Sequence, residues 1–575
     1  MKWRRYLFSV AGSISLYCLI PVSLVQGQIA SDGTLPTNVT TSDNHNFTIS
    51  GGSQVGGNLF HSFRELSVPT GGSAVFQNGT DVQNIISRVT GSSISNIDGL
   101  LKTDGTANLF LLNPNGIIFG PNAELNIGGS FVASTANSLK FADGSEFSAT
   151  NPSAPPLLTL NVPVGLQYGP SPGRIVNQSK VTDSSGFPVG LQVQPSKTLA
   201  LVGGEVVLEG GNLNAPGGRI EVGSVARNSL IRLNPTNKGL DLSYEGVQNF
   251  QDIHLSQGAV IDVSDPSGLV GSGDIQVQGR HVTLTDGSQI SSITGGSISA
   301  GTVEVTASET VELIGTSANV ASNLNTVTLG DGNAGDLRIK TGQLIIRDGA
   351  EVSAATYFGA AGQGGTLNVA ASKSVEVIGT GIGREGQLVP STLRAASEGA
   401  GNAGDLTIAT GKLSVRDGAE VTVSGMRGGA AGNLEVRANS IKLDNSGSLR
   451  AETAAGDRGS ITLLTRDLQL RHGSAINTNA SGAATGGNIT INTDTLVALE
   501  DSDITANAVQ GQGGNIQINA QGAFLSSDSE ITASSQRGIN GTVEIRTPDI
   551  GIGSSVTQLE ANFVAPEQVI AGSCL

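Results

Sequence analysis

The sequence predicts an all-β protein, a right-handed parallel β-helix (β-solenoid) with a cap over its N-terminal end. Three observations point to this fold class. Apolar residues alternate with polar ones along most of the chain, as in strands with one buried face. A glycine-led segment recurs at a nearly constant interval. The 575 residues include 80 glycines, while only 4% are aromatic and 14% charged. Such a composition suits a solenoid, in which glycine forms corners, better than several compact domains.

Residues 1–27 are expected to be a secretory signal peptide. Basic side chains at Lys2, Arg4 and Arg5 precede a mostly apolar run, and the small residues that follow predict cleavage before Gln28. The alternative is an uncleaved membrane anchor, because the apolar run approaches the ~20 residues that span a bilayer. Pro21 and the small residues after it favour the cleaved leader.

Residues 28–150 are expected to form the cap and the first coils. This stretch contains nine of the fifteen phenylalanines: Phe47, Phe60, Phe63, Phe76, Phe110, Phe119, Phe131, Phe141 and Phe147. The first coil of a solenoid exposes its core and its unpaired strand edge unless something covers them. Large apolar side chains at this end therefore indicate a cap, and a separate small β-domain is the alternative.

Within this stretch, a defined turn joins two predicted strands. It is formed by Asn113, Pro114, Asn115, Gly116 and Ile117. Proline fixes its own φ and holds the residue before it extended, and the Asn-Gly pair tolerates positive φ. The chain is therefore expected to reverse or turn a corner here.

This turn has a specific sequence context. The segments Gly56–Phe63 (GGNLFHSF) and Gly128–Thr135 (GGSFVAST) flank it. Together the three segments resemble the N-terminal secretion domain of the filamentous-haemagglutinin family, over roughly Ile29 to Ala149. The resemblance implies export by two-partner secretion. It also implies that an outer-membrane β-barrel transporter with periplasmic recognition domains binds the segment from Asn113 to Ile117.

The chain departs from the family pattern at one place. Many relatives carry an Asn-Pro-Asn-Leu turn where this chain has Asn84–Gly91 (NIISRVTG). By position, a secondary contact with the transporter is predicted for four residues of this segment, Asn84, Ile85, Ile86 and Arg88. The missing turn weakens any statement about how they make that contact.

Residues 151–272 are expected to continue the β-helix irregularly, with loops that stand off the main body. Prolines are dense in their first part, at Pro152, Pro155, Pro156, Pro163, Pro170 and Pro172, which is typical of irregular crossing segments. Regular alternation returns at Gly218–Val222.

Residues 273–545 are expected to be a repeat β-helix of about 27 residues per coil. A glycine, one variable residue and an apolar-x-apolar triplet begin at Gly273, Gly301, Gly335, Gly365, Gly404, Gly432, Gly459, Gly487, Gly514 and Gly541. Most steps between these glycines are equal to within a single position, and the longer steps indicate surface insertions. Residues 546–575 are then a C-terminal tail, in which Cys574 is the one cysteine outside the leader.

One duplication shows the plan of a repeat. Residues 333–352 and 402–421 are identical at 15 of 20 positions. In each copy, alternating apolar pairs predict three short strands, with the turns Arg347–Gly349 and Arg416–Gly418 between the second and third; Arg471–Gly473 stands in the same register. No helical periodicity is present, and leucine-rich and propeller repeats differ in pattern or length.

The residues indicate no catalytic or metal site. Carboxylates gather at Glu500, Asp501 and Asp503 and at Asp331 and Asp336, but both groups also suit exposed turns, which we favour. The histidines His45, His61, His254, His281 and His472 show no metal-ligand spacing. Calcium is the one cofactor left open, because Gly330–Asp336 is similar to the turns of calcium-binding β-rolls; it occurs only once.

The sequence thus predicts an exported, non-enzymatic surface or extracellular protein that acts as an adhesin or a matrix component. Its partners would be the transporter and a glycan or protein on a host or neighbouring cell. The insertions between Gly301 and Gly404 are the predicted binding surface. A net charge of −16 argues against nucleic-acid binding. The alternative function is a secreted polysaccharide lyase or hydrolase, since such enzymes also use parallel β-helices.

Overall fold

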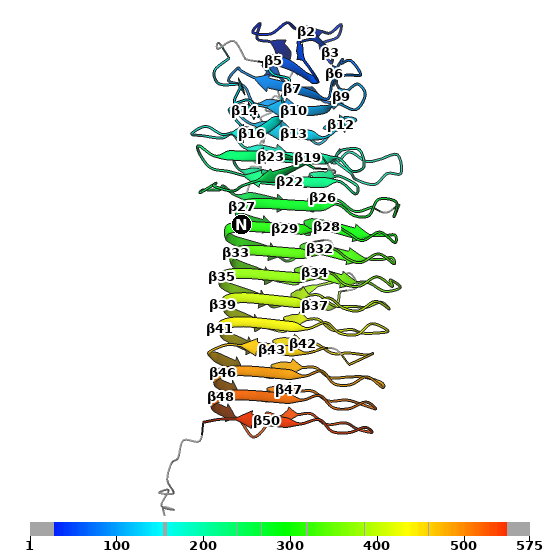
Figure 1. Cartoon of the computed structure of the whole chain (residues 1–575), viewed down its shortest axis with the longest axis vertical. Coiled ribbons are helices and arrows are strands. Elements are labelled where there is room, and N and C mark those ends of the chain that lie inside the picture. The colour runs from blue at the N-terminus through cyan, green and yellow to red at the C-terminus, as the bar shows by residue number, and fades with distance from the viewer. Residues whose placement is uncertain are drawn as a thin grey trace, which may run out of the picture. The chain divides into compact units, whose positions relative to one another are not determined.

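The computed structural model describes residues 28–548 except 153–157, 237–238, 266, 318–319, 384–385 and 458. The predicted leader, Cys574 and residues 549–575 of the predicted tail lie outside the described residues. Every regular element among the described residues is a β-strand. Contacts divide the chain into unit 1 (residues 1–342 and 382–387) and unit 2 (residues 343–381 and 388–575). Each unit is an all-β parallel β-solenoid, which confirms the predicted fold class (Figure 1).

In unit 1, parallel strands stack coil upon coil in three faces. The first face contains β5 (Asn58–Leu66), β7 (Asn84–Val89), β10 (Asn108–Leu112), β13 (Phe131–Ser134), β19 (Thr198–Gly203), β22 (Arg219–Ser224), β27 (Asp274–Leu284) and β29 (Val303–Ile314). The second contains β8 (Ser95–Ile97), β11 (Ile117–Phe119), β17 (Ile175–Asn177), β20 (Val206–Glu209) and β25 (Ile253–Ser256). The third contains β3 (Asn46–Gly51), β6 (Ser73–Phe76), β9 (Leu100–Thr103), β12 (Glu124–Asn126), β18 (Leu191–Gln192), β21 (Asn212–Asn214), β26 (Val260–Asp262), β28 (Gln289–Thr294) and β32 (Asn323–Thr328).

Antiparallel strands close the N-terminal end of unit 1. They are β1 (Ile29–Ser31), β2 (Thr37–Thr40) and β4 (Ser53–Val55). Strands β1 and β4 pair with β5, which pairs on its other edge with the parallel strand β7, and β2 pairs with β3. The free edge of the first parallel strand is therefore covered, as the predicted cap requires.

A separate antiparallel sheet, here called the lateral sheet, lies against the first face of unit 1 (Figure 1). Its strands are β15 (Glu146–Ser148), β14 (Ser138–Phe141), β16 (Pro163–Gln167), β23 (Leu230–Thr236) and β24 (Gly239–Ser243). Both faces of the first-face strands are buried, because side chains such as Phe60, Phe110 and Val132 pack against Leu166 and Ile231 of the lateral sheet. Unit 1 thus has a second core outside the coils.

The second core buries some of the nine phenylalanines of residues 28–150. All nine are buried, but they do not all belong to the cap: Phe60, Phe110, Phe141 and Phe147 fill the space between the first face and the lateral sheet. Phe60 meets the rings of Phe141 and Phe147 edge-on at 5.9 and 5.1 Å. The sequence assigned these aromatics to the cap and the first coils; it did not predict the lateral sheet, which buries these four side chains on the outer side of the coils.

In unit 2, one long and one short strand make each coil. The long strands are β35 (Leu367–Ile378), β39 (Leu406–Arg416), β41 (Leu434–Asp444), β46 (Ile489–Ala498) and β48 (Ile516–Leu525), with β43 (Ile461–Leu464) and β44 (Asp467–Leu470) dividing one coil and β50 (Val543–Arg546) ending the series. The short strands are β34 (Glu351–Thr356), β38 (Thr392–Arg394), β40 (Glu420–Thr422), β42 (Ser448–Arg450), β45 (Ala475–Asn477), β47 (Asp503–Thr505) and β49 (Ile531–Thr532). From β39 to β50 these strands lie one above another in Figure 1.

The coils differ from the sequence prediction in one respect. The first two of the three expected strands are usually one strand with a bend, since the pairing of β39 with β41 runs to Thr410 and resumes at Lys412, leaving out Gly411. The predicted turn before the third strand is confirmed. There Asp417 and Gly418 have φ of 61° and 80°, and His472 and Gly473 have φ of 53° and 69°.

The recurring glycine has a steric explanation. A Cβ added to Gly432 would lie 1.8 Å from the carbonyl oxygen of Gly404 in the preceding coil, and one added to Gly541 would lie 1.7 Å from that of Gly514. Any side chain here would push successive coils apart, so the repeat keeps glycine where backbone stacks on backbone.

The insertions predicted from the long steps form small hairpins. One consists of β30 (Thr316–Ser317) and β31 (Val320–Ala321), the other of β36 (Thr380–Ile382) and β37 (Leu388–Pro390). β33 (Leu337–Arg347) and β36 contain boundaries between the two units.

Candidate functional site: the corner at Asn113–Ile117 and the strand before it

The segment from Asn113 to Ile117 forms a corner between β10 and β11, where the chain passes from the first to the second face of unit 1. Asn113 is fully buried, and its Nδ2 donates to the Ser93 carbonyl oxygen and to Ser95 Oγ, both at 3.0 Å. Its Oδ1 accepts from the backbone N–H of Asn115 at 3.0 Å. Asn113 therefore holds the corner closed and ties it to the preceding coil.

The other corner residues stack between two coils. Asn115 Nδ2 donates to the Gly91 carbonyl oxygen of the preceding coil at 2.7 Å. The backbone N–H of Gly173 in the following coil donates to the Pro114 carbonyl oxygen at 3.0 Å. Gly116 has φ of 130°, while Asn115 is not in the left-handed region. The sequence allowed positive φ at both Asn115 and Gly116, and the structure uses it only at Gly116.

The residues from Asn113 to Ile117 differ in their exposure to solvent. Asn113, Gly116 and Ile117 are buried, Pro114 is half-buried and Asn115 is exposed. Beside them lies Ile94, an apolar side chain with 38% exposure; its Cγ1 would lie 3.6 Å from a Cβ on Gly116. A protein that binds the folded corner would therefore meet Pro114, Asn115 and Ile94. Sequence reasoning missed Ile94, because only the stacking of coils brings it beside the motif.

The predicted secondary contact has a different environment. Asn84, Ile85, Ile86 and Arg88 lie in β7, where every residue is buried. Ile85 faces the interior of the coils, and the other three lie on the opposite face, beneath the lateral sheet. These side chains are not accessible in the folded unit, so their contact with a transporter stays a prediction that concerns the chain before it folds.

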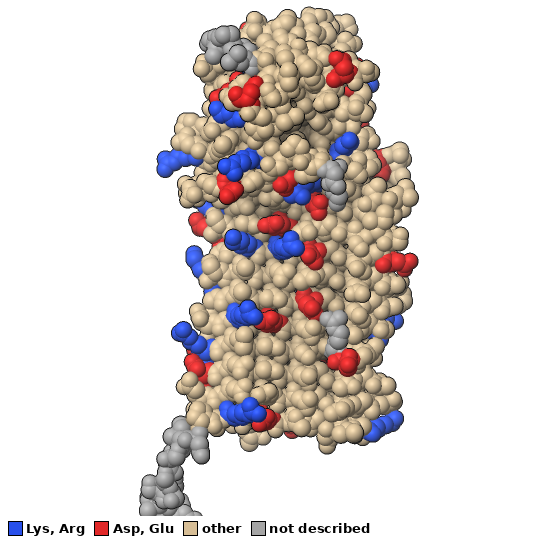
Figure 2. Space-filling model, viewed as in Figure 1, with Lys and Arg blue, Asp and Glu red and all other residues tan. Residues whose placement is uncertain are grey.

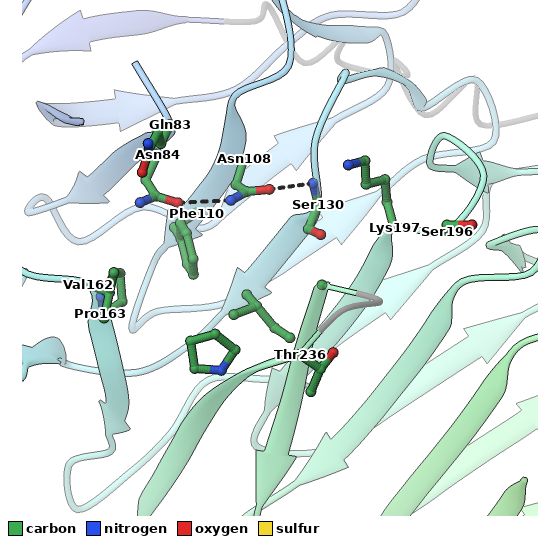
Figure 3. Close-up of a pocket in the computed structure, with 13 residues that line it drawn as sticks. Gln83, Asn84, Asn108, Phe110, Ser130, Val162, Pro163, Ser196, Lys197 and Thr236 are labelled. Atoms are coloured by element: carbon green, nitrogen blue, oxygen red, sulfur yellow. Dashed lines mark hydrogen bonds between the residues drawn. The ribbon is translucent and has the colours of Figure 1, made fainter. Parts of the chain in front are cut away.

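In the structure, Asn84 belongs to an amide ladder that runs across coils (Figure 3). Asn84 Nδ2 donates to Asn58 Oδ1 at 2.9 Å, and Asn108 Nδ2 donates to Asn84 Oδ1 at 2.9 Å. The ladder ends where the Ser130 N–H donates to Asn108 Oδ1 at 2.7 Å. At its other end, Asn58 Nδ2 donates to the carbonyl oxygens of Thr159 and Asn161. The ladder therefore also fastens the segment that leads to β16.

Arg88 forms a second buried network. With 1% exposure, it donates through Nε to Ser62 Oγ at 2.8 Å, through Nη1 to the Ser148 carbonyl oxygen at 2.6 Å and through Nη2 to Thr34 Oγ1 at 3.0 Å. Its guanidinium carbon lies 4.3 Å from the centre of the Phe147 ring. Burial lowers the pKa of Arg88, while nearby Asp32 favours its charged form. One side chain thus joins the cap, β5 and the lateral sheet.

A cavity of about 330 Å³ borders the amide ladder (Figure 3). Amides, hydroxyls and Lys197 share its wall with apolar side chains such as Phe110, Val162 and Leu240. The amides of Asn84 and Asn108 are already hydrogen-bonded to each other. The cavity is therefore a gap beneath the lateral sheet whose main polar groups are occupied.

Comparisons with known proteins find similarity to secretion domains in this region. Residues 27–277 match the family model of the TPS secretion domain. The secretion domain of HMW1 from Haemophilus influenzae is 15% identical, with 89% of this chain and 98% of that chain covered and a TM-score of 0.32. The filamentous hemagglutinin secretion domain is 18% identical, with 55% and 98% covered and a TM-score of 0.25. These low scores carry no argument about geometry. No curated protein matches.

In the part of the chain that the structure describes, no helix is long and apolar enough to cross a membrane, and no three His, Cys, Asp or Glu side chains gather as a metal site. Residues 27–277 contain the sequence motifs, the capped coils and the whole match to the family model. These residues match a TPS secretion domain, and the match supports a passenger protein of two-partner secretion.

Proposed function

We propose that the corner from Asn113 to Ile117 is the element that the periplasmic domains of the outer-membrane transporter recognise. Its arrangement supports this role. Asn113 and Gly116 fix the backbone from inside, so that Pro114 and Asn115 are presented at the surface in one conformation. A pre-ordered epitope binds with a smaller entropy cost than a flexible loop. The single observation that carries the proposal is the exposure of Asn115 on a rigid corner within the TPS secretion domain.

Export measurements test the proposal. Asn115→Ala removes one exposed amide and its bond to Gly91, so we expect near-native folding but reduced release into the medium by cells that contain the transporter. Gly116→Val should reduce both folding and release into the medium. A branched side chain does not fit there, because Gly116 has φ of 130° and an added Cβ would lie 3.0 Å from the Arg174 carbonyl oxygen. Ser92→Ala, on the exposed loop of the preceding coil, is the control. Normal export of folded Asn115→Ala and Pro114→Ala variants would refute recognition of the exposed corner.

We further propose that the exported solenoid acts by contact, as an adhesin or as a component of a surface or biofilm matrix. Two features support this role. The hairpin of β36 and β37 exposes two apolar side chains, Ile382 at 59% and Leu388 at 74%. The face in Figure 2 is mostly uncharged, and basic and acidic side chains are interspersed on it. Such a surface suits binding through hydrogen bonds and small apolar contacts. Replacing residues 383–387 with Gly-Ser should reduce adhesion or biofilm mass without reducing secretion.

A polysaccharide lyase or hydrolase is the competing function. Two of the carboxylates singled out from the sequence support the non-enzymatic proposal. Glu500 and Asp501 have φ of 63° and 59° in a turn, and Glu500 accepts two hydrogen bonds from Arg471 at 2.8 and 2.6 Å. Incubating the secreted protein with acidic polysaccharides, with and without calcium, distinguishes the two functions. New reducing ends or unsaturated sugars would establish an enzyme and refute the proposal.

A further inference from the structure

The last described coil of unit 2 is covered over only half its length. Strand β50 pairs with the first half of β48, Ile516 with Val543 and Ile518 with Ile545. The second half of β48 pairs with β46 on one edge, but among residues 28–548 as described no strand pairs with its other edge or with the outer edge of β49. An open parallel edge of this kind carries unpaired backbone N–H and C=O groups.

Apolar side chains at this end are exposed where earlier coils bury them. Leu525 is 41% exposed, although Ala498, its partner in the preceding coil, is 1% exposed. Val543 and Ile545 are 42% and 40% exposed, whereas the same columns are almost fully buried one coil earlier. These three residues occupy the core positions of a coil that lacks a neighbour on one side.

The sequence after Arg546 continues the pattern of the coils. Strands stack here at a constant sequence offset, which is the same from Ile489 to Ile516 as from Ile516 to Val543. That offset places Ile550 over Ala523 and Ile552 over Leu525, with Asp549, Gly551 and Gly553 on the outward side. This is the alternation of a strand with one buried face.

The column of the short strand fixes no register for a continuation. Its last described step, from Ile504 to Ile531, equals the step from Leu449 to Ile476 and places the polar Gln558 over Ile531. The longer step, from Ile476 to Ile504, places Leu559 there. The sequence therefore encodes the long half of a further coil in residues 549–553.

We propose that residues 549–553 of the same chain dock on this open end in parallel register, with Ile550 and Ile552 covering Ala523 and Leu525. The occupant is the chain's own segment and not a second copy, because it follows Arg546 directly. Such a tether supplies an effective concentration on the order of millimolar. The docked segment pairs the open edge and keeps copies of the protein from joining end to end.

Disulfide trapping in the full-length chain tests the register. In a background with Cys18→Ser and Cys574→Ser, the pair Ala523→Cys and Ile550→Cys should form an intramolecular disulfide, since stacked parallel strands bring paired Cα atoms within bonding range. The matched control pairs Ala523→Cys with Gly551→Cys, one residue out of register and on the opposite face, and should bond at least tenfold less. Equal bonding in the two pairs, or bonding in neither, would overturn the proposal.

Hydrogen exchange gives a second readout that needs no cysteine. Amides of Gly522–Leu525 should exchange at least tenfold faster in the double variant Ile550→Asp/Ile552→Asp than in the native chain, and Asp549→Ser should leave them unchanged. Exchange that is already fast in the native chain would overturn the proposal. Protection that disappears on dilution, together with a concentration-dependent dimer, would also overturn it and assign the end to a second copy.

Discussion

Asn108 Nδ2 donates to Asn84 Oδ1 over 2.9 Å, from one coil of unit 1 to the one before it. Both strands bury almost every residue; Asn84 is buried and Asn108 is half-buried beside the cavity. A buried amide that loses its partner keeps its full desolvation cost. The ladder therefore couples the stability of several coils to single asparagines.

Replacing Asn108 with alanine should lower the free energy of unfolding of unit 1 by about 1–3 kcal/mol, because it leaves Asn84 Oδ1 and the Ser130 N–H without their partner. Chemical denaturation followed by circular dichroism measures the change. Gln83→Ala is the control, since Gln83 is exposed beside the same cavity. Equal effects of the two substitutions would show that the ladder adds no stability.

Arg88→Met should destabilise unit 1 by about 2–4 kcal/mol, because it keeps much of the apolar stem but removes three hydrogen bonds and the contact with Phe147. Hydrogen exchange should rise together in the β1–β2 segment around Thr34, in β5 and in β15, because Arg88 joins these elements. Arg64→Met, at an exposed position of β5, should change neither measurement. A rise confined to β7 would contradict the role of Arg88 as a connector.

Stability of the cap should depend on pH through His61. This imidazole is fully buried, its Nε2 has no hydrogen-bond partner and burial lowers its pKa from 6.5 to about 4. Between pH 6.5 and 4 the unfolded chain binds a proton that the folded chain excludes, so acidification removes stability. The loss is about 3 kcal/mol at about 1.4 kcal/mol per pKa unit.

Unfolding of the native chain and of His61→Gln at pH 7.5 and pH 4 measures this effect. The drop in stability on acidification should be about 3 kcal/mol smaller in the variant, while His45→Gln controls for the substitution itself. An identical pH dependence in all three proteins would refute the assignment to His61.

Gly432→Ala should cost about 3 kcal/mol or more in unit 2, because the added Cβ would lie 1.8 Å from the Gly404 carbonyl oxygen. Gly428→Ala, in the turn just before it, places its Cβ 3.5 Å from the nearest atom, an ordinary contact. The two variants are chemically identical changes, so their difference in melting temperature isolates the clash between coils. A Gly432→Ala variant as stable as Gly428→Ala would mean that the coils can move apart without a loss of stability.

The sequence predicted the regular part of the fold because each coil has the same local pattern. The glycine register and the turn at Asp417 follow from steric rules that act within a few residues or between neighbouring coils. The lateral sheet did not emerge from the sequence. Its strands are short, antiparallel and separated by prolines, and Phe60 and Phe141 show no feature that would tell a second core from a cap.

The candidate site was predicted in part for the same reason. Proline and glycine rules locate a corner at Asn113–Gly116. They do not reveal that Asn113 is buried and bonds to the preceding coil, or that Asn115 is exposed. Nor do they reveal that Ile94 lies beside Gly116. All three facts depend on how successive coils stack. The burial of β7 depends on a sheet whose last strands, β23 and β24, come much later in the chain.

The lateral sheet sets a minimum length of chain for completing the first coils. Asn58 bonds to the carbonyl oxygen of Thr159, and Phe60 and Ile86 belong to the same core as Ile231 and Leu242. The outer side of β5 and β7 therefore stays uncovered until the chain is available as far as Leu242. Any route that delivers the N-terminus first has to keep that apolar side from aggregating before the later strands arrive.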